Sequence, residues 1–283
     1  MNNSERTSPL LLDSSLIITT KNKIYDVKLV QCGDFVQLYL QDSKKLKREN
    51  NDSYDLELKK IKIDKMFENN SKKIKSNNLV ENIEEKNIIR SKLQCQRLAK
   101  ANINDWKTFI TLTFAKNITD IDSANKRFRY FIDKVQRIKK DLKYLCITEF
   151  QKRGAIHYHL LCNIDISDTS LIYRQEDNEK FLHIKYWLDG FTSVEPIAND
   201  TKKIIGYISK YMTKDIDNRL FNHRRYFYSR NLKKPLESYI DLDNIKESLF
   251  LQKLIQDKEL IYQNDYINPY DNGKVTFLEL RTK

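Results

Sequence analysis

The pattern of apolar and polar positions is clearest between residues 105 and 163. WKTFITLTFA (106–115) is β-branched and aromatic throughout, which is typical of a buried strand. Residues 123–142 repeat apolar side chains every three to four positions, which predicts an amphipathic helix. Two further strands, 144–150 and 155–163, are joined by the short turn QKRG. The apolar stripe of the helix consists of Phe128, Phe131, Ile132, Val135, Ile138 and Leu142.

Less regular elements follow these strands. FLHIKYWLD (181–189) predicts a short helix, TSVEPI (192–197) a strand, and residues 200–214 a further helix. The order is then strand, helix, strand, strand, helix, strand, helix. This order favours an α+β fold of the ferredoxin-like type, in which helices cover an antiparallel sheet.

The regions on either side of this core have weaker patterns. Residues 1–40 contain two strand-like runs, KIYDVKLV and DFVQLYL, with CGD as the turn. Residues 41–80 are rich in Lys, Asn and Ser and poor in aromatic side chains. We expect them to form a basic insertion, either a solvated linker or a non-specific contact to DNA. Residues 81–104 have a helical pattern, and the region after 215 contains a polar helix and a final strand, KVTFLEL.

These patterns predict three segments. Residues 1–104 hold N-terminal strands, the basic insertion and a helix. Residues 105–235 form the α+β core, and residues 236–283 form a C-terminal extension.

The charge of the chain narrows the choice of partner. Lys and Arg number 51 against 39 Asp and Glu in 283 residues, which gives a net charge of +12. Such an excess favours a polyanionic partner through phosphate contacts and counterion release. A basic soluble protein without a nucleic-acid partner has the same charge, so this count alone does not decide.

Cysteines and the N-terminus bear on the compartment. The four cysteines form no CxxC pair, so neither a zinc ribbon nor a disulfide framework is indicated. The N-terminus lacks a cationic start followed by a long apolar run, and no stretch of about 18 apolar residues exists. We therefore expect no signal peptide, no membrane partner and a place in the cytoplasm of a bacterial host cell.

His157 and His159 are the most specific local signal. They stand two positions apart on a predicted strand, so both imidazoles point to one face of the sheet. Two imidazoles on one face are suited to hold a metal ion. The alternative is two polar positions on a solvent-facing side of the strand, and the spacing alone does not separate these readings.

Glu149 lies on the preceding strand. If the hairpin loop is Lys152-Arg153-Gly154, Glu149 sits opposite His157 and shares its face, whereas a two-residue loop turns Glu149 to the other side. Two histidines and one carboxylate suit Mn²⁺ and accept Mg²⁺. The alternative for Glu149 is a cross-strand partner of a Lys or Arg side chain.

Tyr207 and Tyr211 share one face of the predicted helix 200–214, and each is followed three residues later by a lysine, Lys210 or Lys214. A tyrosine hydroxyl has a pKa of about 10, so it is a weak nucleophile unless its target is activated. A metal ion on a scissile phosphate supplies that activation, and a nearby ammonium stabilises charge on the phosphate. Without the two histidines, tyrosines that pack on the sheet would be the better explanation.

Taken together, three blocks resemble a known family. TLTF (111–114), EFQKRGAIHYHLLCN (149–163) and YISKYMTK (207–214) are similar, in this order, to the signature blocks of the HUH endonucleases. The resemblance is closest to rolling-circle replication initiators of small single-stranded DNA phages and related plasmids. It covers residues 105–235, including SRNLKKP (229–235) at its end. TLTF alone is a generic strand, so the specificity lies in the combination.

The resemblance implies a metal-dependent DNA nickase and strand transferase. His157, His159 and Glu149 would bind Mg²⁺ or Mn²⁺. Tyr207 and Tyr211 would be nucleophiles that leave a 5′-phosphotyrosine and a free 3′-OH. The second tyrosine would cut the regenerated origin so that the strands rejoin without ATP.

The remaining roles concern binding. Lys210 would position the scissile phosphate, and the spacing of Lys214 from Tyr211 suggests a similar DNA contact. The expected partners are single-stranded or hairpin origin DNA, a host polymerase that extends the 3′-OH, and a host helicase. The helicase is expected because no G-x-x-x-x-G-K-[ST] run is present.

The basic aromatic run NHRRYFYSRNLKKP has two readings. Its cations and rings could contact single-stranded DNA by charge and stacking, or they could cover the edge of the sheet. The residues concerned are Arg224, Arg225, Tyr226, Phe227, Tyr228, Arg230, Lys233 and Lys234.

Other functions remain open at this stage. A single-strand transposase is disfavoured by the paired tyrosines, and a relaxase by the absence of three clustered histidines. A non-catalytic nucleic-acid-binding protein or a structural protein with a basic surface is also compatible with the charge.

Overall fold

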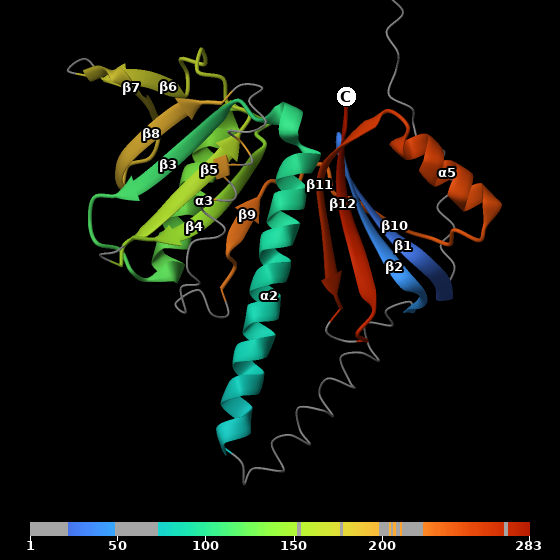
Figure 1. Cartoon of the computed structure of the whole chain (residues 1–283). Coiled ribbons are helices and arrows are strands. Elements are labelled where there is room, and N and C mark those ends of the chain that lie inside the picture. The colour runs from blue at the N-terminus through green and yellow to red at the C-terminus, as the bar shows by residue number, and fades with distance from the viewer. Residues whose placement is uncertain are drawn as a thin grey trace, which may run out of the picture. The chain divides into compact units, whose positions relative to one another are not determined.

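The structure is a computed structural model that forms two compact units (Figure 1). The first unit combines residues from both ends of the chain, 1–30, 36–69 and 237–283, and the second consists of 31–35 and 70–236. The residues that the structure describes are 22–48, 73–151, 154–175, 178–197, 204, 206, 207, 210, 223–268 and 271–283. None of the helices in these residues is long and apolar enough to cross a membrane.

A seven-stranded sheet forms the centre of the second unit. The strand order is β6-β7-β8-β3-β5-β4-β9, and the paired strands run antiparallel. In chain order the strands are β3 (Thr108–Phe114), β4 (Tyr144–Phe150), β5 (Ile156–Cys162), β6 (Ile172–Gln175), β7 (Asn178–Ile184), β8 (Gly190–Pro196) and β9 (Tyr226–Tyr228).

The connections within this sheet place β3 and β5 at its centre. The chain passes from β3 through helix α3 (Ile121–Ile138) to β4, and β5 then returns between β3 and β4. This is the split β-α-β arrangement of ferredoxin-like folds. The predicted α+β class is therefore confirmed, with an antiparallel sheet at its centre.

The predicted helix 181–189 is wrong. Its first residues belong to β7, which pairs with β6 and β8, and Lys185 N then donates to Leu171 O at 2.8 Å. The side chains follow a period of two, because Ile184 is buried while Phe181 is 48% exposed. A hairpin of β6 and β7 thus takes the place of the second crossover helix.

Helix α3 covers one face of the sheet. Asp120 caps its N-terminus by accepting a hydrogen bond from Ser123 N at 2.8 Å. Phe128, Phe131 and Val135 are buried against strand residues such as Tyr158, which confirms the predicted stripe. The helix ends at Ile138, whose side chain is 41% exposed, so the last turn of the expected helix does not form.

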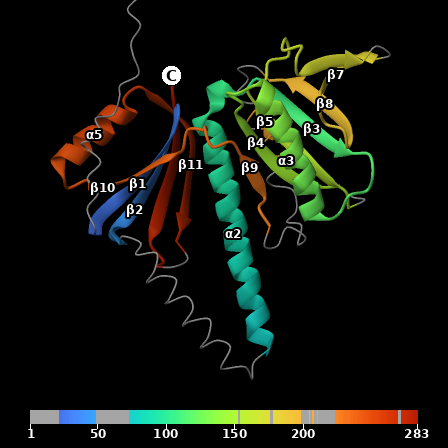
Figure 2. The same ribbon diagram turned by 180° about the vertical axis from the view of Figure 1, so that it is seen from behind.

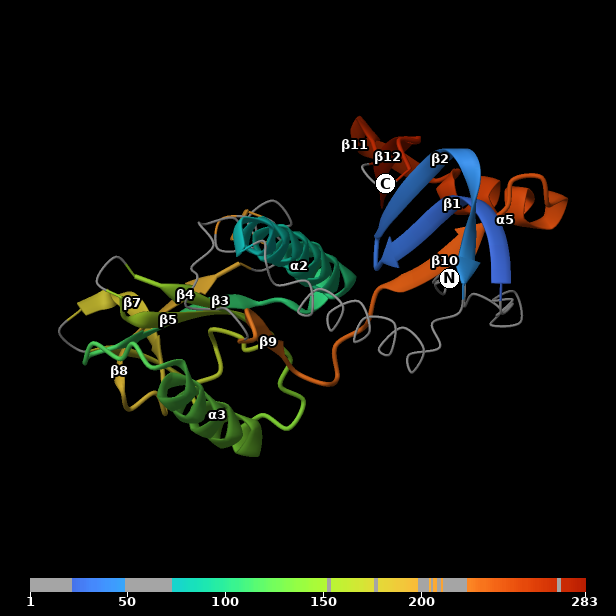
Figure 3. The same ribbon diagram turned by 90° about the horizontal axis from the view of Figure 1, so that it is seen from below.

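Helix α2 (Lys73–Ala101) lies over the other face, and Figure 3 shows the sheet between α2 and α3. It begins eight residues before the expected start at 81. At its end Asn102 ties the helix to the segment after β9, since its Oδ1 accepts from Lys233 N at 2.8 Å. A short 3₁₀ helix, Ile103–Asp105, leads into β3.

The first unit is a five-stranded sheet with helix α5 (Ile245–Ile255), visible from two sides in Figures 1 and 2. Its core includes Val27, Val36, Ile240 and Leu251. The strand order is β10-β1-β2-β12-β11. The strands are β1 (Asn22–Cys32), β2 (Phe35–Arg48), β10 (Leu236–Ile240), β11 (Lys258–Ile267) and β12 (Lys274–Thr282).

The N-terminal strands, the polar helix and the final strand were expected, whereas β10 and β11 were not. The N-terminal hairpin has the predicted turn, and Gly33 in it adopts a φ of +61°. Strand β2 continues to Arg48, so residues 41–48 belong to the sheet and not to the expected basic insertion. Residues 49–72 of that insertion lie outside the described residues.

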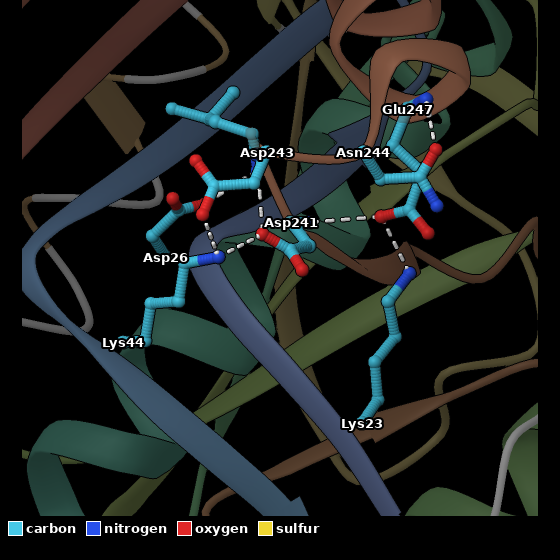
Figure 4. A network of polar contacts seen from close by, with 8 residues as sticks. Lys23, Asp26, Lys44, Asp241, Asp243, Asn244 and Glu247 are labelled. Carbon is cyan, nitrogen blue, oxygen red and sulfur yellow. Dashed lines mark hydrogen bonds and ion pairs between the residues drawn. The ribbon is translucent and has the colours of Figure 1, made fainter.

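Ionic contacts join the start of α5 to β1 and β2 (Figure 4). Lys44 Nζ lies 2.5 Å from both Asp241 Oδ1 and Asp243 Oδ2. Glu247 Oε2 accepts from Lys23 Nζ at 2.7 Å and from Asp241 N at 2.8 Å. Charge pairs therefore hold residues from opposite ends of the sequence together.

Candidate active site

The hairpin of β4 and β5 has the register that a three-residue loop produces. Glu149 pairs with His157 across the strands, and Gln151 N donates to Ala155 O at 2.8 Å. The loop closes with Gly154, whose φ of +89° suits glycine. The conditional prediction that Glu149 shares a sheet face with His157 and His159 is thus confirmed.

Glu149 contacts His159, its diagonal neighbour. Oε2 of Glu149 lies 2.7 Å from Nε2 of His159, and the two side chains are 13% and 5% exposed. An ionised carboxylate only accepts hydrogen bonds, so Nε2 carries a proton in this arrangement. Nδ1 of the neutral ring then accepts from the Thr111 hydroxyl on β3, 3.2 Å away.

His157 completes a set of two nitrogen ligands and one oxygen ligand. Its ring centroid lies 6.2 Å from that of His159. Within the described residues, no group of three or more His, Cys, Asp or Glu side chains is close enough to hold a metal ion as the side chains stand. The donor types nevertheless suit Mn²⁺ or Mg²⁺. Adjacent ligands of an octahedral ion with bonds of about 2.1 Å lie about 3 Å apart, and the 2.7 Å from Glu149 to His159 is close to this separation.

Tyr207 lies over the same sheet face. Its ring stacks on Phe109 with centroids 4.1 Å apart and planes at 5°. Phe109 in turn stacks on His159, 5.7 Å away at 9°. The Tyr207 hydroxyl donates a short hydrogen bond to Glu195 Oε2 on β8. The structure therefore brings Tyr207 and His159 onto one face, with Phe109 in contact with both.

The other residues predicted on this helix are less fully described. Tyr207 and Lys210 are helical, and the Lys210 side chain is exposed. Tyr211 and Lys214 lie outside the described residues, so their predicted roles stay predictions.

Phe109, Thr111 and Glu195 are site residues that sequence reasoning missed. Phe109 and Thr111 are alternate positions of the strand 106–115, so they necessarily share a face. Thr111 pairs with His159 on one side and with Ser193 of β8 on the other. A period-two reading of that strand, applied to polar as well as apolar side chains, would have identified Thr111.

The basic aromatic run covers the sheet edge along part of its length. Tyr226 and Tyr228 belong to β9, which pairs with β4, while Phe227 packs on Phe128 in the core at 5.8 Å. Burial raises the pKa of Tyr226 to about 12. Lys234 Nζ lies 3.8 Å from the centre of the Tyr228 ring.

The cations of this run are largely open to solvent. Arg224, Arg230 and Lys233 are exposed, and Arg225 is half-buried with its carbonyl accepting from Thr148 N. The aromatic part therefore completes the sheet, while the arginines leave a charged margin at its edge.

Comparison with known proteins gives two matches. Residues 107–216 match the family model of the replication-associated proteins of the ORF2 type. The Phasyl DNA replicon protein arp of Escherichia coli is 30% identical over 149 residues, which cover 46% of this chain and 52% of that protein. The chain thus spans about half the length of this relative. No solved structure matches. The resemblance to replication initiators that the three sequence blocks indicated is confirmed by these matches.

Proposed function

We propose that this chain, whose residues 107–216 match a family of replication-associated proteins, initiates rolling-circle replication by nicking one DNA strand with a tyrosine. The observation that carries the proposal is the face shared by His157, His159, Glu149 and Tyr207. A nucleophile and a potential metal site on one sheet face, inside the matched segment, are what a strand-cleaving initiator requires.

His157, His159 and Glu149 would hold the divalent ion. The ion supplies Lewis-acid activation of the scissile phosphate. Thr111 fixes the His159 ring, because its hydroxyl bonds Nδ1 and thereby directs Nε2 toward Glu149. Such second contacts keep a ligand in one tautomer and one orientation.

A tyrosine performs the covalent step. As the phenolic oxygen of Tyr207 or Tyr211 bonds to phosphorus, the bond from phosphorus to the 3′ oxygen breaks. The phenol loses its proton and the 3′ oxygen gains one, so the products are a 5′-phosphotyrosine and a 3′-OH. The ester retains the energy of the broken bond, and a later attack by a 3′-OH rejoins the strand without ATP. Lys210 would neutralise charge on the phosphate.

Binding of origin DNA adds to this chemistry. Arg224, Arg225 and Arg230 at the sheet edge, together with Lys214, would contact the phosphates of single-stranded or hairpin DNA. Host polymerase extends the 3′-OH, and a host helicase separates the strands.

The test is cleavage of single-stranded oligonucleotides tiled across the replicon that encodes the chain. With Mn²⁺ we expect a covalent adduct on Tyr207 or Tyr211, located by mass spectrometry, and none with EDTA. Tyr207→Phe combined with Tyr211→Phe abolishes the adduct, whereas the control Tyr130→Phe, on α3 at the opposite sheet face, keeps it. A folded wild-type chain that forms no adduct on any oligonucleotide would instead be a non-catalytic DNA-binding protein.

Metal binding is measured separately from cleavage. Mn²⁺ at a hundred times its Kd should stabilise the folded chain by about 2.7 kcal/mol, seen as a rise in the thermal midpoint. His157→Ala with His159→Ala removes this rise. The matched control His183→Ala, on β7 of the same sheet, retains it. A rise that persists in the double variant places the ion elsewhere.

A further inference from the structure

We propose that Phe109 and Glu195 hold Tyr207 in a resting position and thereby determine that Tyr211 makes the first cut. The inference rests on the proposed function, because it concerns the choice between two nucleophiles. Glu195 acts here as a positioning residue that selects the nucleophile.

Two contacts fix Tyr207 in this position. The stack on Phe109 is close and nearly parallel, with centroids 4.1 Å apart and planes at 5°. Phe109 itself is only 3% exposed, so its ring is a fixed platform. The hydroxyl, the atom that must attack, is bound to the Glu195 carboxylate. A hydrogen bond to a charged acceptor is among the stronger ones in proteins.

The strand register places this carboxylate away from the histidines. Phe109 pairs with Glu195 of β8 on one side and with Leu161 of β5 on the other. His159 and His157 belong to β5, so the centre strand β3 separates them from Glu195. Neighbouring strands are about 4.8 Å apart, so the backbones of β8 and β5 are about 10 Å apart. The Tyr207 hydroxyl is thus directed toward the side of β3 away from the proposed metal ligands.

Attack on phosphorus needs a closer approach. Reacting atoms must come within about 3–3.5 Å of each other, and the phosphate must itself reach the ion held by the histidines. Tyr207 therefore has to leave Glu195 before it can react. When it does, its oxygen bonds to phosphorus, the bond to the 3′ oxygen breaks, its proton passes to solvent, and the 3′ oxygen takes a proton from solvent.

The cost of leaving Glu195 biases the first cut. Tyr211 sits one helical turn further along the predicted helix and is the other nucleophile of the pair. Its attack does not require the Tyr207–Glu195 hydrogen bond to break. Tyr207 is then kept in reserve for the second cut, which follows after the DNA has been rearranged.

The experiment measures how the adduct is divided between the two tyrosines. The full chain is mixed with a cleavable oligonucleotide and Mn²⁺ for a single turnover, and the peptides that carry Tyr207 and Tyr211 are quantified. In the wild type we expect Tyr211 to carry most of the adduct. Glu195→Gln, which removes the charge, should raise the ratio of Tyr207 to Tyr211 adduct about tenfold, the factor expected for one charge-assisted hydrogen bond.

Control variants separate selection from folding. Glu195→Asp restores a carboxylate and should return the ratio toward the wild-type value. Phe109→Leu keeps an apolar side chain but removes the stack, so it should also raise the Tyr207 share. Asp133→Asn, an exposed carboxylate on α3, should leave the ratio unchanged.

The opposite results are equally clear. A wild-type adduct mainly on Tyr207, an unchanged ratio in Glu195→Gln, or a lower Tyr207 share in that variant would each overturn the inference while leaving the nickase function standing. In the last case Glu195 would be an acceptor for the attacking hydroxyl's proton. Absence of any adduct in the folded wild type would overturn the proposed function itself.

Discussion

His159 has contacts to three side chains from two strands. Glu149 on β4 bonds one ring nitrogen, Thr111 on β3 bonds the other, and Phe109 on β3 stacks on the ring. The ring therefore cannot rotate without losing all three contacts. This fixed orientation is a condition for precise metal binding, since ligand geometry must be held by surrounding groups.

Phe191 offers a test of where DNA lies on this face. It pairs with Thr113, which pairs in turn with His157, so all three share the face, and its ring is 70% exposed. Base stacking on an exposed ring contributes about 1–3 kcal/mol per base. Phe191→Ala should therefore weaken single-stranded DNA binding by about tenfold or more, measured by fluorescence anisotropy.

The control for this variant is another exposed aromatic residue. Tyr130 on α3 is 56% exposed and belongs to the helix that covers the opposite sheet face. Tyr130→Ala should leave the affinity within twofold. Equal losses in the two variants would show that the bound strand does not follow the face of His157.

The histidine and carboxylate face could be predicted from the sequence, because the period of a strand and the length of a short hairpin loop are local properties. Glu195 could not be predicted in the same way. It meets Phe109 through the pairing of β3 with β8, and it meets Tyr207 from a separate helix. Pairings between distant strands are set by the tertiary fold, and no local pattern marks them.

At the scale of elements, the pairing of β8 with β3 is what brings Glu195 and Phe191 to the site. It begins at Gly190, which pairs with Phe114. A Cβ atom on Gly190 would lie 2.1 Å from Thr113 O and 2.4 Å from Ala115 N, both backbone atoms. Only glycine allows β8 to start this close to β3.

Gly190→Ala should therefore lower the free energy of unfolding by about 1–3 kcal/mol, the usual cost of inserting atoms into a packed region. Urea denaturation of the purified chain measures it. Gly206→Ala is the matched control, because a Cβ there meets nothing within 4 Å and Gly206 is helical. That variant should hold or slightly raise stability. A Gly190→Ala chain as stable as the wild type would mean that β8 does not start against β3.

The erroneous helix at 181–189 has a physical explanation at the same scale. A short apolar run fits either a helix or a strand, and the choice depends on what its backbone pairs with. Here β6 supplies one partner and β8 the other. Strand β9 shows the same dependence, because three aromatic residues in a basic run become an edge strand beside β4.

At the scale of the whole molecule, buried tyrosines link stability to pH. Burial raises the pKa of both Tyr144 and Tyr226 from 10.0 to about 12, and it also raises the pKa of Tyr158. Their folded pKa values exceed the unfolded values, so the folded state favours the protonated phenols. The resulting stability is complete below about pH 10 and is lost as the pH rises from about 10 to about 12.

We therefore expect the urea midpoint of unfolding to be level near neutral pH and to fall steadily above about pH 10. Tyrosinate absorbance recorded in parallel should show part of the phenols ionising only as the chain unfolds. Tyr226→Phe should make the fall shallower. A midpoint that does not change up to about pH 11 would mean that these phenols are open to solvent.

The first unit is built from both ends of the described chain, and this has a consequence for biosynthesis. Strand β2 ends at Arg48, but its neighbour β12 begins at Lys274. At about 5–20 residues per second, the ribosome needs roughly ten to fifty seconds to make the intervening chain. All strands of the second unit leave the ribosome during that interval. The seven-stranded sheet can thus fold first, while the N-terminal hairpin waits for its partner with apolar side chains uncovered, a state in which nascent chains need chaperones.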